Sequence, residues 1–512
     1  MNFSRVYSAQ TSLLNVHTVS VETDISRGLF AFALVGLPDK AVEEARDRVS
    51  AAIKNSDYTS PKSKNQKIVI SLAPASEKKE GPSFDLAIAL SYLLASEEID
   101  FNPEGKLFLG ELGLDGALRP VRGVLPIARY AKEAKFKELY VPKENAEEAA
   151  LIDGVTIYAA ETLVEVITHL EGKKVLKPTP LTKLGKHAST VRTDFSDVRG
   201  QERAKRGLLI AAAGGHNVAM YGPPGTGKTM LAKAFAGILP SLSFDEALET
   251  TSIHSVAGVL SGFITEPPFR SPHHTSSYVS LVGGGATPKP GEVTLAHRGV
   301  LFMDEFPEFD RKVIEALRQP LEDRVISVSR AKGTAHFPAD VLLVAAMNPC
   351  PCGNYGFRGK PCICTPSALQ RYRRKMSGPI IDRIDIWLEV DRVSTADLSA
   401  SEDSPSVHAE KSDHYRNDVE HARARQAERF KTNVKLKKNA EMSSRDLINF
   451  VSLDDKAKHA LNLAADRLNF SPRVYHRMIK VARTIADLED ADAVTQNHIL
   501  EAVEYRPKKF DI

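Results

Sequence analysis

The chain has 512 residues, which at about 150 residues per domain is enough for three domains. Apolar residues make up 42% and charged residues 26%, close to the globular average, so wholesale disorder, collagen and a coiled coil are excluded. Lys and Arg number 68 against 65 Asp and Glu, and this formal net charge of +3 means that any nucleic-acid site has to be a local patch.

The sequence carries no pattern typical of membrane insertion or secretion. No window reaches about 18 unbroken apolar residues, the length that a membrane span needs. The start, Met1 to Gln10, lacks a basic flank followed by an apolar stretch. We therefore expect a cytoplasmic protein with no membrane partner.

Along the chain, the residue pattern predicts an α/β multidomain protein with three domains and two linkers. In the first domain, short β-rich runs such as Lys67–Leu72 alternate with helical runs such as Phe84–Leu94. The second domain alternates strands and helices as an open parallel sheet does, and the third is helical. Polar stretches separate them. The predicted bounds are 1–172, 196–393 and 413–512 for the domains, and 173–195 and 394–412 for the linkers.

A phosphate-binding loop stands between a predicted strand, Asn217–Tyr221, and a predicted helix, Met230–Leu239. The residues between them, Gly222–Thr229, match the P-loop pattern G-x-x-x-x-G-K-[ST]. Its glycines let backbone N–H groups close around phosphate, and the helix start adds the positive end of its dipole. Lys228 is expected to reach the β and γ phosphates of ATP, and Thr229 to bind Mg²⁺. The other expected nucleotide contacts are Gly222, Pro223, Pro224, Gly225, Thr226 and Gly227.

Polar side chains follow the ends of two further predicted strands. Asp304 and Glu305 follow Gly299–Met303, and Asn348 follows Val341–Met347. A carboxylate at a strand end beside a P-loop is where Mg²⁺ needs a partner, so Asp304 is predicted as a metal ligand and Glu305 as the base that polarises water. Asn348 is predicted to sense the γ-phosphate. The alternative interpretation is that Asn348 is an ordinary turn residue.

Four cysteines lie directly after that strand, all in one short window. This placement favours a metal cluster over the disulfides of a secreted chain. Four thiolates suffice for a closed tetrahedral Zn²⁺ site, and the alternatives are reduced structural thiols or a redox disulfide. The residues are Cys350, Cys352, Cys362 and Cys364.

Three strand ends of this kind resemble an AAA+ ATPase, and finer motifs narrow the family. The runs Ala296–Glu305, Pro268–Thr275 and Leu281–Gly285 look like the magnesium-chelatase-like branch, and within it the ComM/YifB group of DNA-processing ATPases. The resemblance covers nearly the whole chain. It implies a Lon-protease-like α/β domain, an AAA+ P-loop module with a parallel sheet and inserted hairpins, and a helical C-terminal lid.

The resemblance also implies two arginines that act on ATP. Arg383 matches an arginine finger serving the neighbouring subunit, where a permanently charged guanidinium stabilises the transferred phosphoryl group. The alternative interpretation is that Arg383 only forms a surface ion pair with Asp382. Arg473 is the sensor-2 candidate, at the second position of a helix capped by Ser471. Arg477 and Lys480 share its face, so this role could fall one turn later. The helix's expected apolar face is Val474, Met478, Val481, Ile485 and Leu488.

Candidate DNA contacts follow from the same resemblance. A hairpin with a basic tip is predicted around 325–337. In this branch such a hairpin enters the ring's pore, so the resemblance makes Arg330 and Lys332 candidate DNA-phosphate contacts, and the alternative is a solvated turn. His273 and His274 are expected to have a structural or substrate-contact role. A basic run in the lid is either a DNA surface or a solvated helix face: Arg423, Arg425, Arg429, Lys431, Lys435, Lys437 and Lys438.

The first domain resembles Lon-type proteases around Gly81–Ser83, but the partner motif has Leu125 where that family has its catalytic lysine. Ser83 without a base is a weak nucleophile, so no peptidase activity is expected. Taken together, the motifs predict an ATP-hydrolysing protein, and the family resemblance implies a hexameric DNA motor for helicase or branch-migration work in recombination, including DNA integration in natural transformation. The alternatives are a chelatase-like or a chaperone-like remodeller of a protein partner.

Overall fold

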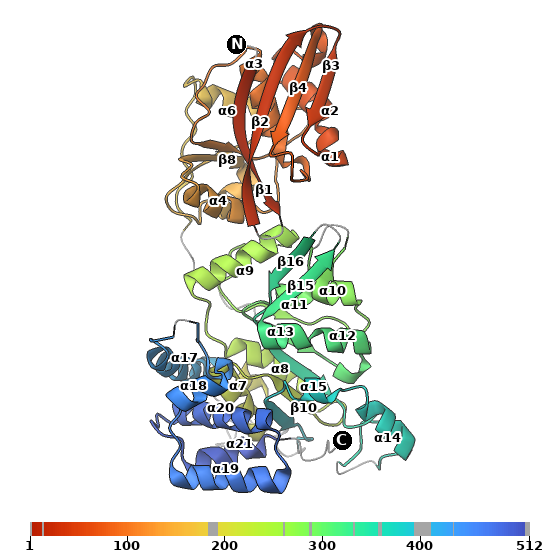
Figure 1. Ribbon diagram of the computed structural model, residues 1–512, viewed down its shortest axis with the longest axis vertical. Coiled ribbons are helices and arrows are strands. Elements are labelled where there is room, and N and C mark those ends of the chain that lie inside the picture. The colour runs from red at the N-terminus through yellow and green to blue at the C-terminus, as the bar shows by residue number, and fades with distance from the viewer. Residues whose placement is uncertain are drawn as a thin grey trace. The chain divides into compact units, whose positions relative to one another are not determined.

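The computed structural model describes residues 3–12, 15–182, 193–259, 262–285, 289–330, 333–356, 361–393, 411–433 and 435–506 (Figure 1). Its residue contacts divide the chain into two units. Unit 1 is Met1–Lys186 with Leu248–Phe263, and unit 2 is His187–Ala247 with Ile264–Ile512. The predicted ATPase core and the helical region thus share one unit, and the three predicted domain bounds stay a prediction.

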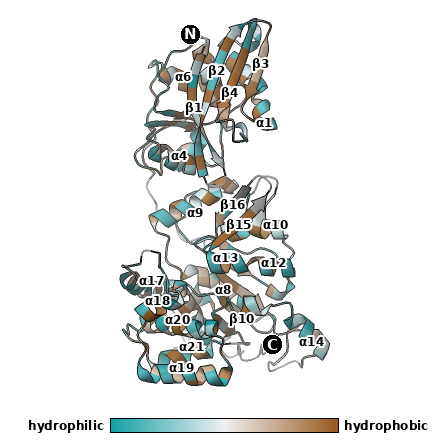
Figure 2. Ribbon diagram, in the orientation of Figure 1, coloured by the Kyte–Doolittle hydropathy of each residue, from teal (hydrophilic) through white to brown (hydrophobic). Residues whose placement is uncertain are grey.

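Unit 1 contains a four-stranded sheet in the order β1-β2-β4-β3. Strands β1, β2 and β4 are antiparallel, and β3 runs parallel to β4. Figure 2 shows the hydrophobic residues on β2 and β4, and in β4 every second residue is buried, as expected for a strand with one covered face. The strands are β1 (Phe3–Ser12), β2 (Asn15–Arg27), β3 (Ala31–Val35) and β4 (Gln66–Ala73).

Helix α3 (Asp85–Ala95) packs against β1 and β2 and is buried almost all round, which is typical of a helix inside a core. A second, parallel sheet has the order β5-β8-β9. The mixed α/β prediction for this part of the chain is confirmed. The remaining elements are α1 (Lys40–Glu43), α2 (Ala45–Asn55), β5 (Lys106–Phe108), β6 (Glu111–Leu112), β7 (Leu118–Arg119), α4 (Val124–Glu133), β8 (Glu138–Pro142), α5 (Ala146–Ala149), β9 (Thr156–Ala160) and α6 (Leu163–Leu170).

Unit 2 is built on a five-stranded parallel sheet in the order β11-β14-β17-β10-β18. Strands β14, β17 and β10 are buried along their whole length, as expected for a parallel sheet covered on both faces. The three strands that the sequence predicted, β10, β14 and β17, are confirmed to within one residue, and β11 and β18 were not predicted. The strands are β10 (Val218–Tyr221), β11 (Phe269–Arg270), β14 (Val300–Met303), β17 (Leu342–Met347) and β18 (Ile386–Glu389).

Helices surround this sheet, and two small hairpins are inserted between its strands. The hairpin β15–β16 is antiparallel, with Arg330 opposite Gly333, so its strands run further than the sequence predicted. The other elements are α7 (Glu202–Gly214), α8 (Lys228–Gly237), α9 (Phe244–Ala257), α10 (Tyr278–Val282), β12 (Gly283–Gly284), β13 (Lys289–Pro290), α11 (Glu292–Leu295), α12 (Arg311–Ala316), α13 (Arg318–Asp323), β15 (Val325–Arg330), β16 (Gly333–Pro338), α14 (Pro366–Arg373) and α15 (Gly378–Ile381).

The C-terminal part of unit 2 is helical, as predicted. Helix α20 begins where the sequence placed it, because Ser471 caps it through the N–H of Val474 and Pro472 takes the first helical position. Four residues of its expected apolar face are buried, and Leu488 packs at the edge of the core. The helices are α17 (Ser412–Arg429), α18 (Ser444–Phe450), α19 (Asp455–Leu468), α20 (Pro472–Leu488) and α21 (Gln496–Glu504).

Helix α17 attaches this helical region to the sheet domain through polar contacts. Arg416 donates to the carbonyl oxygen of Gly237, the last residue of α8, at 2.7 Å. Arg423 donates to the carbonyl of Ala212 near the end of α7 at 2.8 Å. These carbonyls have no partner within their own helices, and the arginine charge suits the negative end of each helix dipole.

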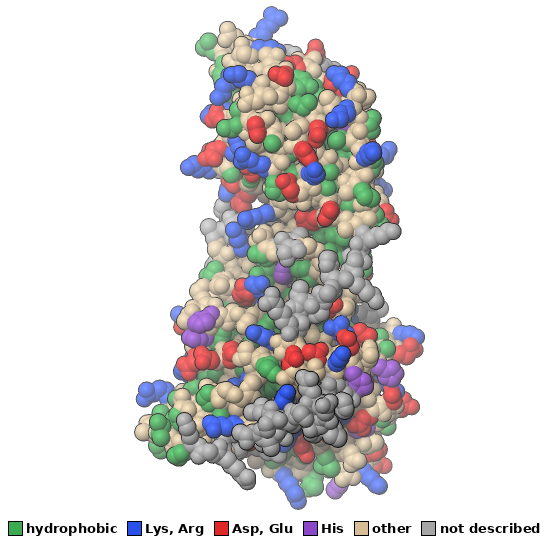
Figure 3. All heavy atoms as spheres, turned by 180° about the vertical axis from the view of Figure 1, so that it is seen from behind, with side chains coloured by type: hydrophobic (Ala, Val, Ile, Leu, Met, Phe, Trp, Pro, Cys, Tyr) green, Lys and Arg blue, Asp and Glu red, His purple; other side chains and the backbone are tan. Residues whose placement is uncertain are grey.

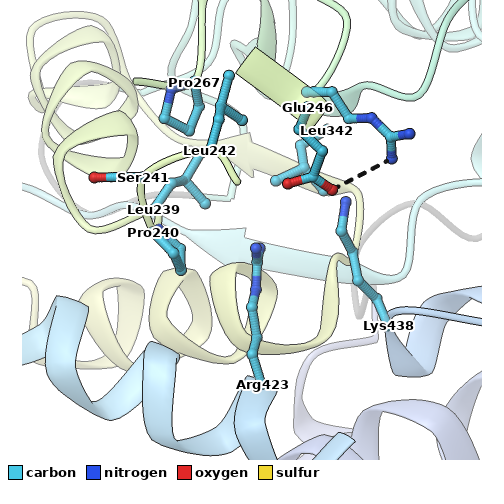
Figure 4. A pocket seen from close by; sticks show the side chains of 10 residues that line it. Leu239, Pro240, Ser241, Leu242, Glu246, Pro267, Leu342, Arg423 and Lys438 are labelled. Atoms are coloured by element: carbon cyan, nitrogen blue, oxygen red, sulfur yellow. Dashed lines mark ion pairs between the residues drawn. The ribbon is translucent and has the colours of Figure 1, made fainter. Parts of the chain in front are cut away.

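The basic run of the helical region is divided between two environments: Arg423, Arg425, Arg429 and Lys438 are partly buried, whereas Lys431, Lys435 and Lys437 are exposed. Figure 4 shows Arg423 and Lys438 pointing into a small pocket whose other side includes Glu246. Glu246 pairs with Lys437 at 2.8 Å, and Arg429 with the fully buried Asp487. Arg423, Arg429 and Lys438 use their charges in packing, so neither a DNA surface nor a solvated face describes these three. Lys437 is 50% exposed, and for it both interpretations stay open. On the face in Figure 3, basic and acidic side chains are interspersed on both units.

Candidate functional site

The P-loop has the conformation that a phosphate needs. Strand β10 ends at Tyr221, and helix α8 starts at Lys228 with Gly227 as its N-cap. Gly225 and Gly227 have φ angles of +76° and +88°, a region that favours glycine. A side chain at Gly222 would collide with the carbonyl oxygen of Val390, 1.9 Å from its Cβ position. The loop therefore leaves the first N–H groups of α8 available to an anion.

Lys228 lies folded over this loop. Its Nζ donates to the carbonyl oxygens of Gly222 and Pro223 at 2.7 and 2.8 Å, and to Asn348 Oδ1 at 3.3 Å. Only 9% of the residue is exposed, and this burial lowers the pKa of its ammonium group to about 8. Phosphate oxygens would replace these carbonyls as its partners.

The two predicted Mg²⁺ ligands meet across the sheet edge. Thr229 Oγ1 donates to Asp304 Oδ2 at 2.8 Å, although Thr229 follows β10 and Asp304 follows β14. A hydroxyl and a carboxylate at this spacing provide oxygen ligands of the kind that Mg²⁺ takes in P-loop enzymes. Thr229 and Asp304 thus fit a magnesium ion, which would supply positive charge beside the phosphates of a nucleotide.

Glu305, the predicted base, has two features that the sequence did not reveal. Its φ of +52° is left-handed, which is uncommon for a residue other than glycine and is often found at functional sites. Its carboxylate lies 3.2 Å from Nδ1 of His274, and the ring of His273 lies beside His274 at 4.2 Å. The His-His motif gives no local sign of this contact, because His274 and Glu305 lie 31 positions apart in the sequence.

Asn348, the predicted γ-phosphate sensor, follows β17, the strand that lies between β14 and β10 in the sheet. Its side chain accepts the hydrogen bond from Lys228. Its backbone carbonyl accepts one from the hydroxyl of Tyr372 at 3.0 Å. Lys228, Thr229, Asp304, Glu305 and Asn348 thus all follow the carboxyl ends of the parallel strands β10, β14 and β17, at the same edge of the sheet.

The two candidate arginines lie at the opposite edge. Arg383 precedes β18, and its carbonyl accepts a hydrogen bond at 3.0 Å from Asn217, the residue before β10. Arg383 and Arg473 both pair with the carboxylate of Glu322, a residue that sequence analysis missed. The partner of Arg383 is thus Glu322 rather than Asp382. Arg477 pairs with Asp385 instead, at 3.0 Å.

This opposite edge also has a hollow. A cavity of about 230 Å³ is lined by Glu322, Arg383, Arg477 and Lys480 among other residues. Lys480 donates to the carbonyl of Ala440 at 3.0 Å, so its ammonium group already has an internal partner. Of the sensor-2 candidates, Arg473 is the one that shares a carboxylate with Arg383.

The four cysteine thiols come together at one point. The Sγ atom of Cys350 lies 3.4 Å from that of Cys352 and 3.8 Å from that of Cys362, and the latter two lie 3.6 Å apart. All four Sγ atoms, that of Cys364 included, lie within 4.8 Å of one another. Zn–S bonds of about 2.3 Å in a tetrahedron place sulfurs about 3.8 Å apart. The donor set therefore fits zinc, and all four cysteines are free of disulfides.

The remaining predicted sites are described only in part. Lys332 lies outside the described residues, and of Arg330 only the backbone at the end of β15 is described. In unit 1, Ser83 lies in a short 3₁₀ turn, Pro82–Phe84. Leu125 is fully buried in α4, where it packs as a core residue. None of the helices within the described part of the chain is both long and apolar enough to cross a membrane.

Family models match three consecutive parts of the chain. The model described as "Magnesium chelatase, subunit ChlI" matches residues 194–398, and "Subunit ChlI of Mg-chelatase" matches residues 21–145. The model described as "Magnesium chelatase, subunit ChlI C-terminal" matches residues 409–506. Together they span both units.

Whole-length relatives are also found. The competence protein ComM of Haemophilus influenzae is 42% identical over 99% of this chain and 98% of its own length. The protein YifB of Escherichia coli is 44% identical over 99% of this chain and 97% of its own length. More distantly, the DNA replication licensing factor mcm-6 of Caenorhabditis briggsae is 24% identical over 62% of this chain and 38% of its own length.

Proposed function

This chain belongs to the ComM/YifB family of magnesium-chelatase-like proteins, and from that premise we propose that it is an AAA+ ATPase working as a hexameric DNA motor. The observation that carries the proposal is the meeting of Thr229 with Asp304 and of Lys228 with Asn348 at one sheet edge. Four residues from three strand ends form a site for a magnesium nucleotide.

Within one subunit, each residue has a separate task. Lys228 and the N–H groups of the P-loop bind the phosphates. Thr229 and Asp304 would hold a Mg²⁺ ion, which would offset phosphate charge during hydrolysis. Glu305 accepts the proton of the attacking water, and His274 orients the Glu305 carboxylate. Asn348 contacts the γ-phosphate from the third strand end.

The two arginines are proposed to act on the neighbouring subunit's ATP. Strands β10 and β18 are parallel neighbours. Arg383 precedes the start of β18, whereas the P-loop follows the end of β10, so Arg383 lies about one strand length away from the P-loop of its own subunit. Arg473 pairs with the same carboxylate, that of Glu322, so we propose that Arg473 acts on the neighbouring subunit's ATP as Arg383 does. A head-to-tail ring presents this edge to the next subunit's γ-phosphate.

DNA is the proposed substrate, because ComM is by name a competence protein and mcm-6 a DNA replication factor. We propose that ATP hydrolysis moves the hairpin with Arg330 and Lys332 along single-stranded or branched DNA. The work would be helicase or branch-migration activity in recombination, including integration of incoming DNA in natural transformation. The four-cysteine site is proposed to hold a structural Zn²⁺.

The test is steady-state ATP hydrolysis with and without single-stranded, duplex and forked DNA, with Lys228→Ala as the blank. We expect stimulation by DNA that falls as salt rises, because phosphate contacts release counterions. ATP hydrolysis without DNA stimulation, under conditions where the protein forms rings, would overturn the DNA motor. A requirement for a protein partner would then favour a chelatase-like remodeller, and stimulation by unfolded polypeptide a chaperone-like one.

A further inference from the structure

The loop that carries the cysteines touches the P-loop directly. Gly353, one residue after Cys352, has a φ of +78°. A Cβ atom at this position would lie 2.4 Å from Cδ and 2.7 Å from Cγ of Pro224. The backbone of the cysteine loop is therefore in van der Waals contact with the loop that is expected to bind phosphate, and only a glycine allows this approach.

The same loop continues from the γ-phosphate sensor. Asn348 stands two residues before Cys350, whose side chain is fully buried. Cys350 also organises the turn that follows, because its carbonyl accepts from the N–H of Gly353 at 2.9 Å and its Sγ from the N–H of Tyr355 at 3.4 Å. A movement of Cys350 would therefore displace both Asn348 and Gly353.

On its other side the loop is tied to helix α14. Cys364 directly precedes Thr365, which caps that helix through the N–H of Ala368. Tyr372 of α14 is 6% exposed and donates to the carbonyl of Asn348 at 3.0 Å. Arg373 places its guanidinium 5.3 Å from the ring centre of Tyr355. The cysteine loop thus lies between α14 and the P-loop.

Among the described residues of this loop, 350–356 and 361–364, only Cys350 and Gly353 are buried. Of the four cysteines, only Cys350 is buried, and the other three are partly exposed. A metal ion bound by the four thiols would cross-link this short segment, and its bonds would take the place of a hydrophobic core. The metal would then hold both ends of the loop.

We propose that metal binding at Cys350, Cys352, Cys362 and Cys364 controls nucleotide affinity, because it holds Gly353 against Pro224 and Asn348 beside Lys228. Zinc bound to this loop then regulates the ATP site, whereas a purely structural zinc would only stabilise the fold of the loop. This inference rests on the proposed function of the P-loop as a nucleotide site.

The experiment measures binding of a fluorescent ADP analogue by the full chain, with zinc per chain determined by elemental analysis. Metal is removed with a chelator, the chelator is removed, and Mg²⁺ is restored before titration. We expect the metal-free protein to bind about tenfold more weakly or worse, and added zinc to restore binding. The melting temperature and the circular dichroism spectrum show whether unit 2 remains folded.

A variant tests the contact between Gly353 and Pro224 without removing the metal. Gly353→Ala should keep its zinc and still lose affinity, because the added Cβ pushes Pro224 away. Gly172→Ala is the matched control, since Gly172 also has a positive φ, +72°, but no atom within 4 Å of its Cβ position. Cys362→Ser should lose both zinc and affinity.

Equal affinity in folded metal-free and zinc-loaded protein would overturn the inference, as would wild-type affinity in Gly353→Ala. The proposed function fails in a different way. In that case zinc-loaded wild-type protein would bind no nucleotide, or Lys228→Ala would bind as well as wild type.

Discussion

Arg383 and Arg473 donate to opposite oxygens of one carboxylate, that of Glu322. The first arginine comes from the sheet domain and the second from the start of helix α20, 90 residues later. The shared partner places both guanidinium groups at the edge of the sheet away from their own P-loop. In a ring they would therefore approach the same neighbouring nucleotide, with Glu322 as their partner until a γ-phosphate replaces it.

Subunit mixing tests this arrangement. Lys228→Ala subunits keep both arginines, and Arg383→Ala subunits keep the P-loop, so their mixture should regain ATP hydrolysis that neither variant has alone. Arg473→Ala mixed with Lys228→Ala should regain it too. Arg383→Ala mixed with Arg473→Ala should not, because every interface then lacks one arginine. Recovery of hydrolysis in that last mixture would show that Arg473 serves its own subunit's ATP.

Glu305→Gln should separate binding from turnover. The substitution keeps the shape of the side chain but removes the group that accepts the proton of water, so we expect kcat to fall by about a hundredfold or more. Nucleotide affinity should stay near that of the wild type. Rapid-quench hydrolysis and equilibrium binding measure the two quantities, and normal turnover in this variant would exclude Glu305 as the base.

His274→Ala should lower kcat by about tenfold with little change in KM, because the Glu305 carboxylate loses the contact that orients it. His274→Gln keeps a hydrogen-bond donor and should recover part of the loss. His273→Ala is the control, since His273 bonds to Thr275 rather than to Glu305. Equal kcat in wild type and His274→Ala would remove His274 from the site.

Nucleotide affinity should fall as the pH rises above about 8, because burial lowers the pKa of Lys228 to about 8 in the free protein. Above that pH the free protein loses the proton that binding to phosphate requires. The dissociation constant should rise by up to about tenfold per pH unit over this range. Titrations from pH 7 to pH 9.5 measure it, and a flat profile would contradict the lowered pKa.

Asp487→Ala should destabilise unit 2 by about 3 to 5 kcal/mol, because it leaves two arginines without their buried counter-charge. Asp487 is fully buried and pairs with Arg429 and with Arg483, itself 1% exposed. Asp492→Ala is the control, since the Asp492 side chain is fully exposed and its pair with Arg425 should contribute little to stability. The urea midpoint of the transition reports the difference.

Sequence alone determined the elements whose signals are local. The strand, loop and helix around Gly222–Thr229 are contiguous, and the cap at Ser471 acts through a residue three positions later, so spacing was enough to place them. The common edge for Asp304 and Asn348 followed as well, because parallel strands end on one side of a sheet.

Only the tertiary structure decided which distant residues meet. The pairing of His274 with Glu305, the sharing of Glu322 and the contact of Gly353 with Pro224 each join residues from separate elements. The contact of the Arg423 side chain with the carbonyl of Ala212 likewise depends on where α17 packs. Chain spacing cannot specify such contacts, since they are set by how helices pack on the sheet, which depends on the shape of the whole core.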